Sequence, residues 1–284
     1  MNMSFSEFLE YFSLPFIRYA FIVGIIVSLC SSLLGVSLVL KRYSMIGDGL
    51  SHVGFGTLTV AAALNLTEQS LYISIPVVVV SAFLLLRVNE SSKIKGDAAI
   101  ALISTSALAL GYTLSYSSTN SSNIDVCNFM FGSLLTIKKT EVIPSVLLSV
   151  MVLVLFIFFY NRIFAVTFDE TFAKATGTRS GLYNMIIAFL TAVTIVMGMK
   201  IMGTLLISAL IIFPALTSMR VCKSFRGVVI CSAVISIFCC VAGIITGIVL
   251  GSPAGSSVVL CNLALFAVFS VISLLKGRRK VKEL

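Results

Sequence analysis

Long apolar stretches separated by short polar or basic segments recur along almost the whole chain. Because about 20 apolar residues cross the hydrocarbon of a membrane as a helix, this pattern predicts an all-α, polytopic transmembrane helical bundle with about 8 to 9 spans. The stretches run from Phe16 to Leu40, Leu50 to Leu64, Leu71 to Leu86, Ala98 to Tyr116, Val142 to Tyr160, Leu182 to Met199, Ile201 to Met219, Gly227 to Leu250 and Ser256 to Leu275.

Three places in this pattern indicate broken or re-entrant helices. The stretch from Leu50 to Leu64 is short, and Lys200 alone separates the sixth stretch from the seventh. The apolar run from Phe129 to Leu135 is too short to span and predicts a surface or re-entrant helix. Such irregular segments are tolerated where protein or a water-filled cavity surrounds them.

Composition agrees with a membrane protein and excludes a water-soluble domain. Of the 284 residues, 58% are hydrophobic and 11% are charged, and the mean hydropathy is +1.11. The cysteines are scattered through apolar stretches without a CxxC spacing, so we interpret them as small core residues. No linker or change of composition divides the chain, which predicts a single integral-membrane domain over residues 1–284.

The net charge of +9 reflects membrane orientation rather than nucleic-acid binding, because basic residues gather in alternate connections. These connections are predicted to be cytoplasmic, together with the basic tail 276–284. The 15 N-terminal residues are then extracytoplasmic, and their Glu7 and Glu10 are atypical of a signal peptide. Lys138, Lys139 and Lys200 do not fit the pattern. The residues that do fit are Lys41, Arg42, Arg87, Lys93, Lys95, Arg162, Lys174, Arg179, Arg220, Lys223 and Arg226.

Asp48 and His52, the only histidine of the chain, lie four residues apart near the start of the second apolar stretch. On a helix this spacing puts both side chains on one face. Ionisable groups within membrane spans are costly and mark substrate pathways, and a carboxylate with an imidazole suits zinc or manganese. One chain supplies only this pair, so a four-coordinate site would need a second copy across a two-fold axis. The ligand count therefore predicts a homodimer with a central metal path.

A simpler interpretation of the pair stays open. Asp48 is a good helix N-cap, and His52 can make a single hydrogen bond to a neighbouring helix. The small residues around the pair predict close packing between membrane helices under either interpretation. They are Gly47, Gly49, Ser51, Gly54 and Gly56.

The longest connection on the basic side, residues 161–181, predicts a short amphipathic helix. Asp169 and Glu170 favour a helix start, Lys174 follows one turn later, and Gly177 favours a stop. Such a helix suits the docking of a partner protein, although a solvated helical loop accounts for the same charges.

Motifs that are absent narrow the range of functions. The chain has no HExxH, and a single histidine disfavours an intramembrane metalloprotease. It also has no GxxxxGK[ST] phosphate loop, so an ATP-driven transporter would need its ATPase as a separate subunit.

Five segments, in this order, resemble the membrane subunits of metal-ion ABC importers, the zinc/manganese/iron permease family, and among them the zinc permeases. The resemblance covers nearly the whole chain. The segments are Leu34 to His52 with the sequence LGVSLVLKRYSMIGDGLSH, Phe131 to Leu135, Thr167 to Glu170, Met199 to Ala215 and Ser252 to Leu260.

The resemblance implies a type II ABC importer-like fold in the cytoplasmic membrane, a homodimer, two cytoplasmic ATPase subunits and an extracytoplasmic metal-binding protein. It implies that Asp48 and His52 contact the transported metal and that no cofactor is permanently bound. Residues 163–181 become a cytoplasmic coupling segment. Its ATPase-contacting residues would include Asp169, Glu170, Phe172, Ala173 and Gly177. Lys174 departs from the zinc-type pattern, which tends to be acidic or apolar there.

Import of a divalent transition metal, preferably zinc, is the leading functional hypothesis. A manganese or iron importer of the same family remains an alternative. An ion-coupled secondary transporter is a second class, but the chain shows no internal repeat. A non-transporting membrane scaffold is a third class, and it predicts that Asp48→Ala and His52→Ala leave metal accumulation unchanged.

Overall fold

The computed structural model is a bundle of helices, and it describes residues 14–64, 66, 70–91, 96–117, 132 and 139–282. The expected short helix from Phe129 to Leu135 and all but the last two of the 15 N-terminal residues therefore lie wholly or largely outside the described residues. The helices are α2 (Pro15–Leu40), α3 (Ile46–Ala63), α4 (Ser70–Ser91), α5 (Gly96–Ser117), α7 (Lys139–Phe158), α8 (Tyr160–Phe168), α9 (Glu170–Ala175), α10 (Ser180–Met202), α11 (Thr204–Val221), α12 (Phe225–Leu250) and α13 (Ala254–Lys282).

The apolar stretches of the sequence fall on the long helices, with the stretch from Ile201 to Met219 divided between α10 and α11, and the described residues contain no strand. Within the described part of the chain, length and composition qualify six helices to cross a membrane: α2, α7, α10, α11, α12 and α13. Shorter apolar helical stretches lie in α4 and α5. The helix α3, rich in glycine and polar residues, is not among the six, so the predicted number of spans is not confirmed.

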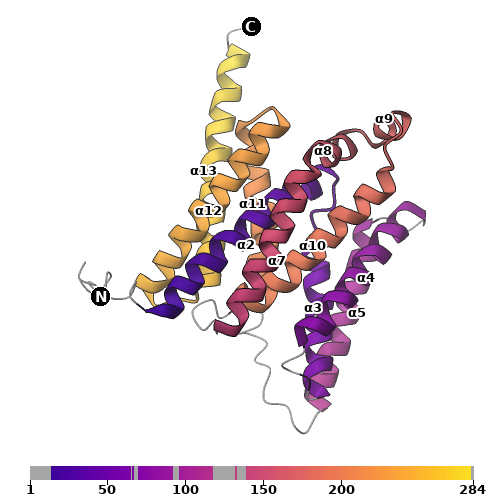
Figure 1. The fold of residues 1–284 in the computed structure, drawn as a ribbon. Coiled ribbons are helices and arrows are strands. Elements are labelled where there is room, and N and C mark those ends of the chain that lie inside the picture. The colour runs from indigo at the N-terminus through magenta and orange to yellow at the C-terminus, as the bar shows by residue number, and fades with distance from the viewer. Residues whose placement is uncertain are drawn as a thin grey trace.

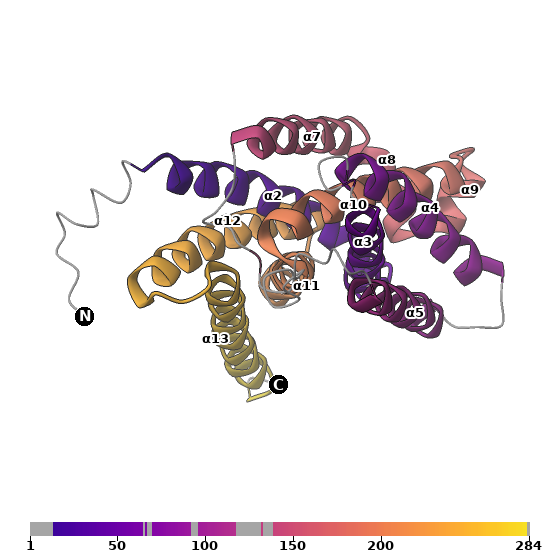
Figure 2. The same cartoon turned by 90° about the horizontal axis from the view of Figure 1, so that it is seen from below.

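Two groups of helices meet at α10. One group is built around α2, which packs against α7, α10, α11 and α12, and α13 packs on the outside of α11 and α12. The other group consists of α3, α4 and α5 (Figures 1 and 2). Because α10 contacts both groups, 78% of its apolar segment is buried, whereas only 11% of that of α13 is buried.

The boundary between α10 and α11 differs from the one expected. Lys200 lies inside α10, and the break comes at Gly203, whose φ of 88° and ψ of 159° suit only glycine. Lys200 itself is paired with Glu141 of α7, with 3.1 Å between Nζ and Oε1. This ion pair gives a physical reason for a lysine that the charge pattern left unexplained.

Candidate metal-binding site

The turn between α2 and α3 sets where the candidate site begins. Tyr43 N–H donates to the carbonyl oxygen of Leu38 at 2.8 Å, and Ile46 N–H donates to that of Tyr43 at 3.0 Å. Arg42 has a φ of 63°, in the left-handed region that a non-glycine residue adopts uncommonly. The result is a tight reversal that brings the start of α3 against α10 and α11.

Asp48 and His52 lie together on one face of α3, as their spacing predicts. The His52 Nε2 atom is 3.6 Å from Asp48 Oδ2. The His52 side chain is 22% exposed and that of Asp48 is 38% exposed. Both groups are therefore sheltered by the bundle and still accessible to a small ion.

The separation of these two atoms fits a shared metal ion. Ligand atoms about 2.1 Å from a tetrahedral zinc lie about 3.4 Å from each other. The observed 3.6 Å needs only a small adjustment to reach that geometry. Within the described residues no cluster of three or more His, Cys, Asp or Glu side chains forms a fuller site.

Asp48 does not have the N-cap role that the simpler interpretation gives it. The helix α3 begins at Ile46, so Asp48 lies inside its first turn rather than before it. Its carboxylate faces His52 and also accepts a long hydrogen bond of 3.5 Å from the Ser208 hydroxyl of α11. Ser208 is buried and connects the pair to a second helix, a contact that the sequence analysis missed.

The glycines of α3 pack closely against three neighbouring helices, as the small residues predict. A methyl group at Gly47 would lie 3.0 Å from the side chain of Ile211 in α11, and one at Gly56 would lie 2.8 Å from the Ala107 carbonyl oxygen in α5. One at Gly54 would overlap the Met199 side chain in α10. These contacts hold the face that carries Asp48 and His52 in a defined orientation.

The predicted short helix is present as α9. The Asp169 carboxylate caps it by accepting from Phe172 N–H at 2.9 Å, Lys174 pairs with Glu170 at 2.9 Å, and Gly177 follows with a φ of 79°. Phe172 is 64% exposed, whereas Ala173 is fully buried. Phe168, at the end of α8, is also exposed, so two phenylalanines one helical turn apart in sequence face away from the bundle.

The pKa values of both acidic residues in this segment lie below their ordinary range. Hydrogen bonds from Phe172 N–H and the Thr171 hydroxyl lower the pKa of Asp169. Burial alone would raise the pKa of Glu170, but hydrogen bonds from Lys174 and Asn184 outweigh it and lower the net pKa. Both carboxylates are therefore ionised at neutral pH.

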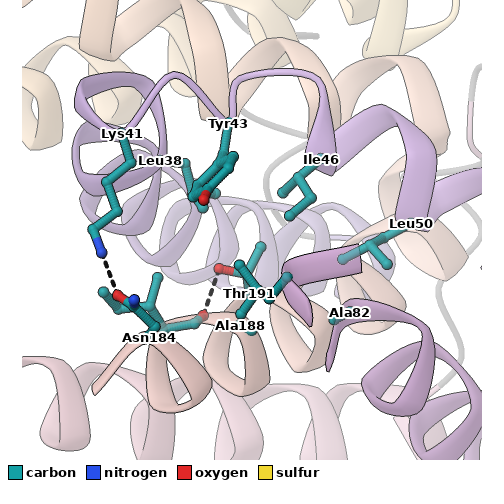
Figure 3. Close-up of a pocket in the computed structure, with 11 residues that line it drawn as sticks. Leu38, Lys41, Tyr43, Ile46, Leu50, Ala82, Asn184, Ala188 and Thr191 are labelled. Atoms are coloured by element: carbon teal, nitrogen blue, oxygen red, sulfur yellow. Dashed lines mark hydrogen bonds between the residues drawn. The ribbon is translucent and has the colours of Figure 1, made fainter. Parts of the chain in front are cut away.

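A polar network joins α9 to the α2–α3 turn. Glu170 accepts from the Ser180 hydroxyl at 3.2 Å and from Asn184 Nδ2 at 3.4 Å. Asn184 Oδ1 in turn accepts from Lys41 Nζ, at the end of α2. Figure 3 shows Lys41 and Asn184 at the edge of a pocket that is lined mainly by apolar side chains. The other pocket residues labelled in the figure are Leu38, Tyr43, Ile46, Leu50, Ala82, Ala188 and Thr191.

Comparison with known proteins shows relatives over almost the full length of the chain. The sequence profile of the ABC 3 transport family matches residues 13–273. The high-affinity zinc uptake system membrane protein ZnuB of Haemophilus influenzae is 30% identical over 92% of this chain and 97% of its own length. The manganese import system permease protein ScaB of Streptococcus gordonii is 27% identical over 94% and 95%.

Two further matches complete this picture. A probable iron transport system membrane protein of Haemophilus influenzae is 26% identical over 98% of this chain and 100% of its own length. Among solved structures, PsaBC from Streptococcus pneumoniae in complex with Fab matches with a TM-score of 0.82 and 27% identity. The match covers 94% of this chain and 95% of that one. Relatives named for zinc, manganese and iron all occur, so similarity alone does not select the metal.

Proposed function

The chain belongs to the ABC 3 transport family, and on that premise we propose that it is the permease subunit of an ATP-driven zinc importer. The relatives are metal transport permeases, and the chain is accordingly a multi-pass membrane protein of the metal ABC importer class. ATP hydrolysis belongs to a separate subunit. Zinc as the cargo and Asp48 and His52 as its transit ligands are the finer parts of the proposal.

The geometry of Asp48 and His52 is the observation that carries the transit site. The pair has the chemistry and the separation that a divalent first-row metal requires. Each chain contributes only these two ligands, and within the described residues no further His, Cys, Asp or Glu side chain joins them. A site with so few acidic groups suits passage better than storage, because its affinity must be low enough to release the ion.

A second copy of the chain supplies the missing ligands in this proposal. Two permeases related by a two-fold axis bring two Asp48 and two His52 side chains to one central path. Two ATPase subunits bind on the cytoplasmic side at α9, and an extracytoplasmic metal-binding protein delivers the ion. ATP binding then shifts the dimer between two states that open to opposite sides of the membrane.

Cellular metal analysis tests the transit site and the metal together. A strain lacking the gene is complemented with the wild-type chain or with His52→Ala, and zinc and manganese contents are measured under limitation of each metal. We expect wild type to restore zinc accumulation and His52→Ala to reduce uptake by at least about tenfold, since it removes a ligand. Val60→Ala, a partly exposed position on the same helix, serves as the control and should retain uptake.

Two outcomes contradict parts of the proposal separately. Full zinc uptake by His52→Ala, at wild-type protein levels in the membrane, means that the transit site lies elsewhere. Restoration of manganese but not zinc by the wild-type chain excludes zinc as the cargo and identifies a manganese importer of the same family.

A further inference from the structure

Three polar side chains, each from a different helix or helix end, form a continuous connection between α9 and the turn that precedes Asp48 and His52. Glu170 lies on α9, Asn184 on α10, and Lys41 at the C-cap of α2. Asn184 uses both ends of its amide, since Nδ2 donates to Glu170 Oε2 and Oδ1 accepts from Lys41 Nζ. The amide thus joins an acidic and a basic side chain that lie more than 120 residues apart in the sequence.

The surroundings of Asn184 make this connection specific. Asn184 is only 8% exposed, and Leu38, Ile187 and Ala188 line the pocket beside it. A buried amide costs free energy unless its donors and acceptors are paired. Asn184 therefore favours the arrangement in which Glu170 and Lys41 both stay in contact with it.

Lys41, at one end of this connection, is close in the sequence to Asp48 and His52. Lys41 begins the turn that runs through Arg42 and Tyr43 into α3, and Asp48 follows in the first turn of α3. This turn is short and internally hydrogen-bonded, so a displacement of Lys41 moves the start of α3. At the other end, Glu170 also pairs with Lys174 of the same helix, with 2.9 Å between Nζ and Oε1.

We propose that Glu170, Asn184 and Lys41 form a positioning relay that couples the position of α9 to the orientation of Asp48 and His52. This inference rests on the proposed function, in which the ATPase contacts α9. Movement of α9 shifts Glu170, Asn184 transmits the shift across α10, and Lys41 carries it to the α2–α3 turn. The three residues act through that turn and do not touch the metal.

The relay predicts uncoupling rather than a simple loss of activity. The complete transporter, with its ATPase and binding protein, is reconstituted in lipid vesicles, and zinc uptake and ATP hydrolysis are measured on the same sample. We expect Asn184→Ala to keep ATP hydrolysis and to lower the zinc transported per ATP about fivefold or more, the lower end of typical coupling between sites. A purely structural role would lower both rates together.

A matched control and a second variant keep the test decisive. Thr191→Ala removes a buried hydroxyl of α10 that donates to the Ile187 carbonyl oxygen of the same helix and leaves the path from Glu170 to Lys41 in place, so its zinc-to-ATP ratio should equal that of wild type. Lys41→Met should lower the zinc-to-ATP ratio as Asn184→Ala does. Lys41→Arg keeps the positive charge and should therefore keep the wild-type ratio. The double variant Lys41→Met/Asn184→Ala should lose no more than either single variant, because both break one path.

The outcomes separate the relay from the proposed function. A wild-type zinc-to-ATP ratio in Lys41→Met and Asn184→Ala overturns the relay while leaving zinc transport intact. Additive losses in the double variant also overturn it. Absence of ATP-dependent zinc uptake by the wild-type complex instead overturns the proposed function. If Asn184→Ala does not assemble, the Lys41→Met and Lys41→Arg pair decides the question alone.

Discussion

At the scale of single residues, Asp48 has two partners with different consequences. His52 is the second candidate metal ligand, whereas Ser208 donates a hydrogen bond to Asp48 Oδ1 at 3.5 Å. That bond is at the long limit for a hydrogen bond and is correspondingly weak, because the single hydroxyl proton of Ser208 also has the Thr204 carbonyl oxygen as a closer acceptor, at 3.0 Å. Ser208 therefore helps to orient the Asp48 carboxylate, and the carboxylate would keep its negative charge without Ser208.

Substitutions at these positions should separate charge from orientation. We expect Asp48→Asn, which removes the anionic ligand but keeps its shape, to lower zinc uptake at least about tenfold. Ser208→Ala should lower it by no more than about fivefold, since a net hydrogen bond contributes about 1 kcal/mol at most here. Uptake assays at limiting zinc, normalised to protein in the membrane, measure both. Equal losses in the two variants would contradict this division of roles.

The sequence predicts part of this site for a clear reason. Asp48 and His52 are local, so their helical spacing alone puts them on one face. Ser208 lies 160 residues away from Asp48 in the sequence, and its contact depends on how α3 packs against α11. Asn184 is similar, because an isolated polar residue in an apolar stretch gives no indication of its partners.

At the scale of elements, hydrophobic patterning locates the long helices but not their breaks. The charge at Lys200 looked like an interruption, yet its contact with Glu141 accommodates it inside α10. The true break is at Gly203, where backbone conformation rather than polarity ends the helix. Glycine occurs so often in membrane helices that its presence alone does not identify a break.

Gly203 should be intolerant of any side chain. Because its φ of 88° and ψ of 159° form a glycine-only conformation, we expect Gly203→Ala to lower the free energy of unfolding by about 1–3 kcal/mol. Thermal unfolding in detergent can be followed with a thiol-reactive dye that reaches the buried Cys30, Cys239 and Cys240. Gly181→Ala, where a methyl group meets no atom within 4 Å, is the matched control. Equal unfolding midpoints for the two variants would show that the helix break at residue 203 tolerates a side chain without strain.

The cap of α9 gives a pH dependence whose sign follows from its lowered pKa. The ionised Asp169 carboxylate accepts the Phe172 N–H bond, so its contribution is complete above the ordinary aspartate pKa of about 3.9. It is lost as pH falls through the lower pKa of the folded protein. Hydrogen exchange of α9, corrected for intrinsic rates, should show constant protection down to about pH 5 and a loss only in stronger acid. An acid-dependent loss that persists in Asp169→Asn would assign the effect to another group.

At the scale of the whole molecule, the proposed half-site on each chain has consequences for mixed assemblies. If two chains complete one site, an assembly with one defective chain is defective as a whole. Independent chains would each retain their own activity. The two arrangements therefore differ in how strongly a defective copy affects a normal one.

Co-expression of differently tagged copies distinguishes these cases. With equal amounts of wild type and His52→Ala, random pairing leaves about one quarter of dimers intact, so we expect zinc uptake to fall to about one quarter. Independent chains would instead give about one half. Recovery of both tags in one purified complex confirms pairing, and mixing wild type with Val60→Ala gives the undiminished reference.

The contrast in burial between α10 and α13 also bears on how freely the sequence can change. Most of the apolar segment of α10 is enclosed by other helices, whereas that of α13 is largely exposed. Each position on α10 must fit several neighbours at once, so even exchanges of one apolar residue for another alter packing. At exposed positions of α13, such as Leu260, Val268 and Leu274, such exchanges leave helix contacts unchanged, whereas its other face packs against α11 and α12. In a library of random variants, these exposed positions should therefore accumulate apolar replacements freely, while α10 stays close to its present sequence.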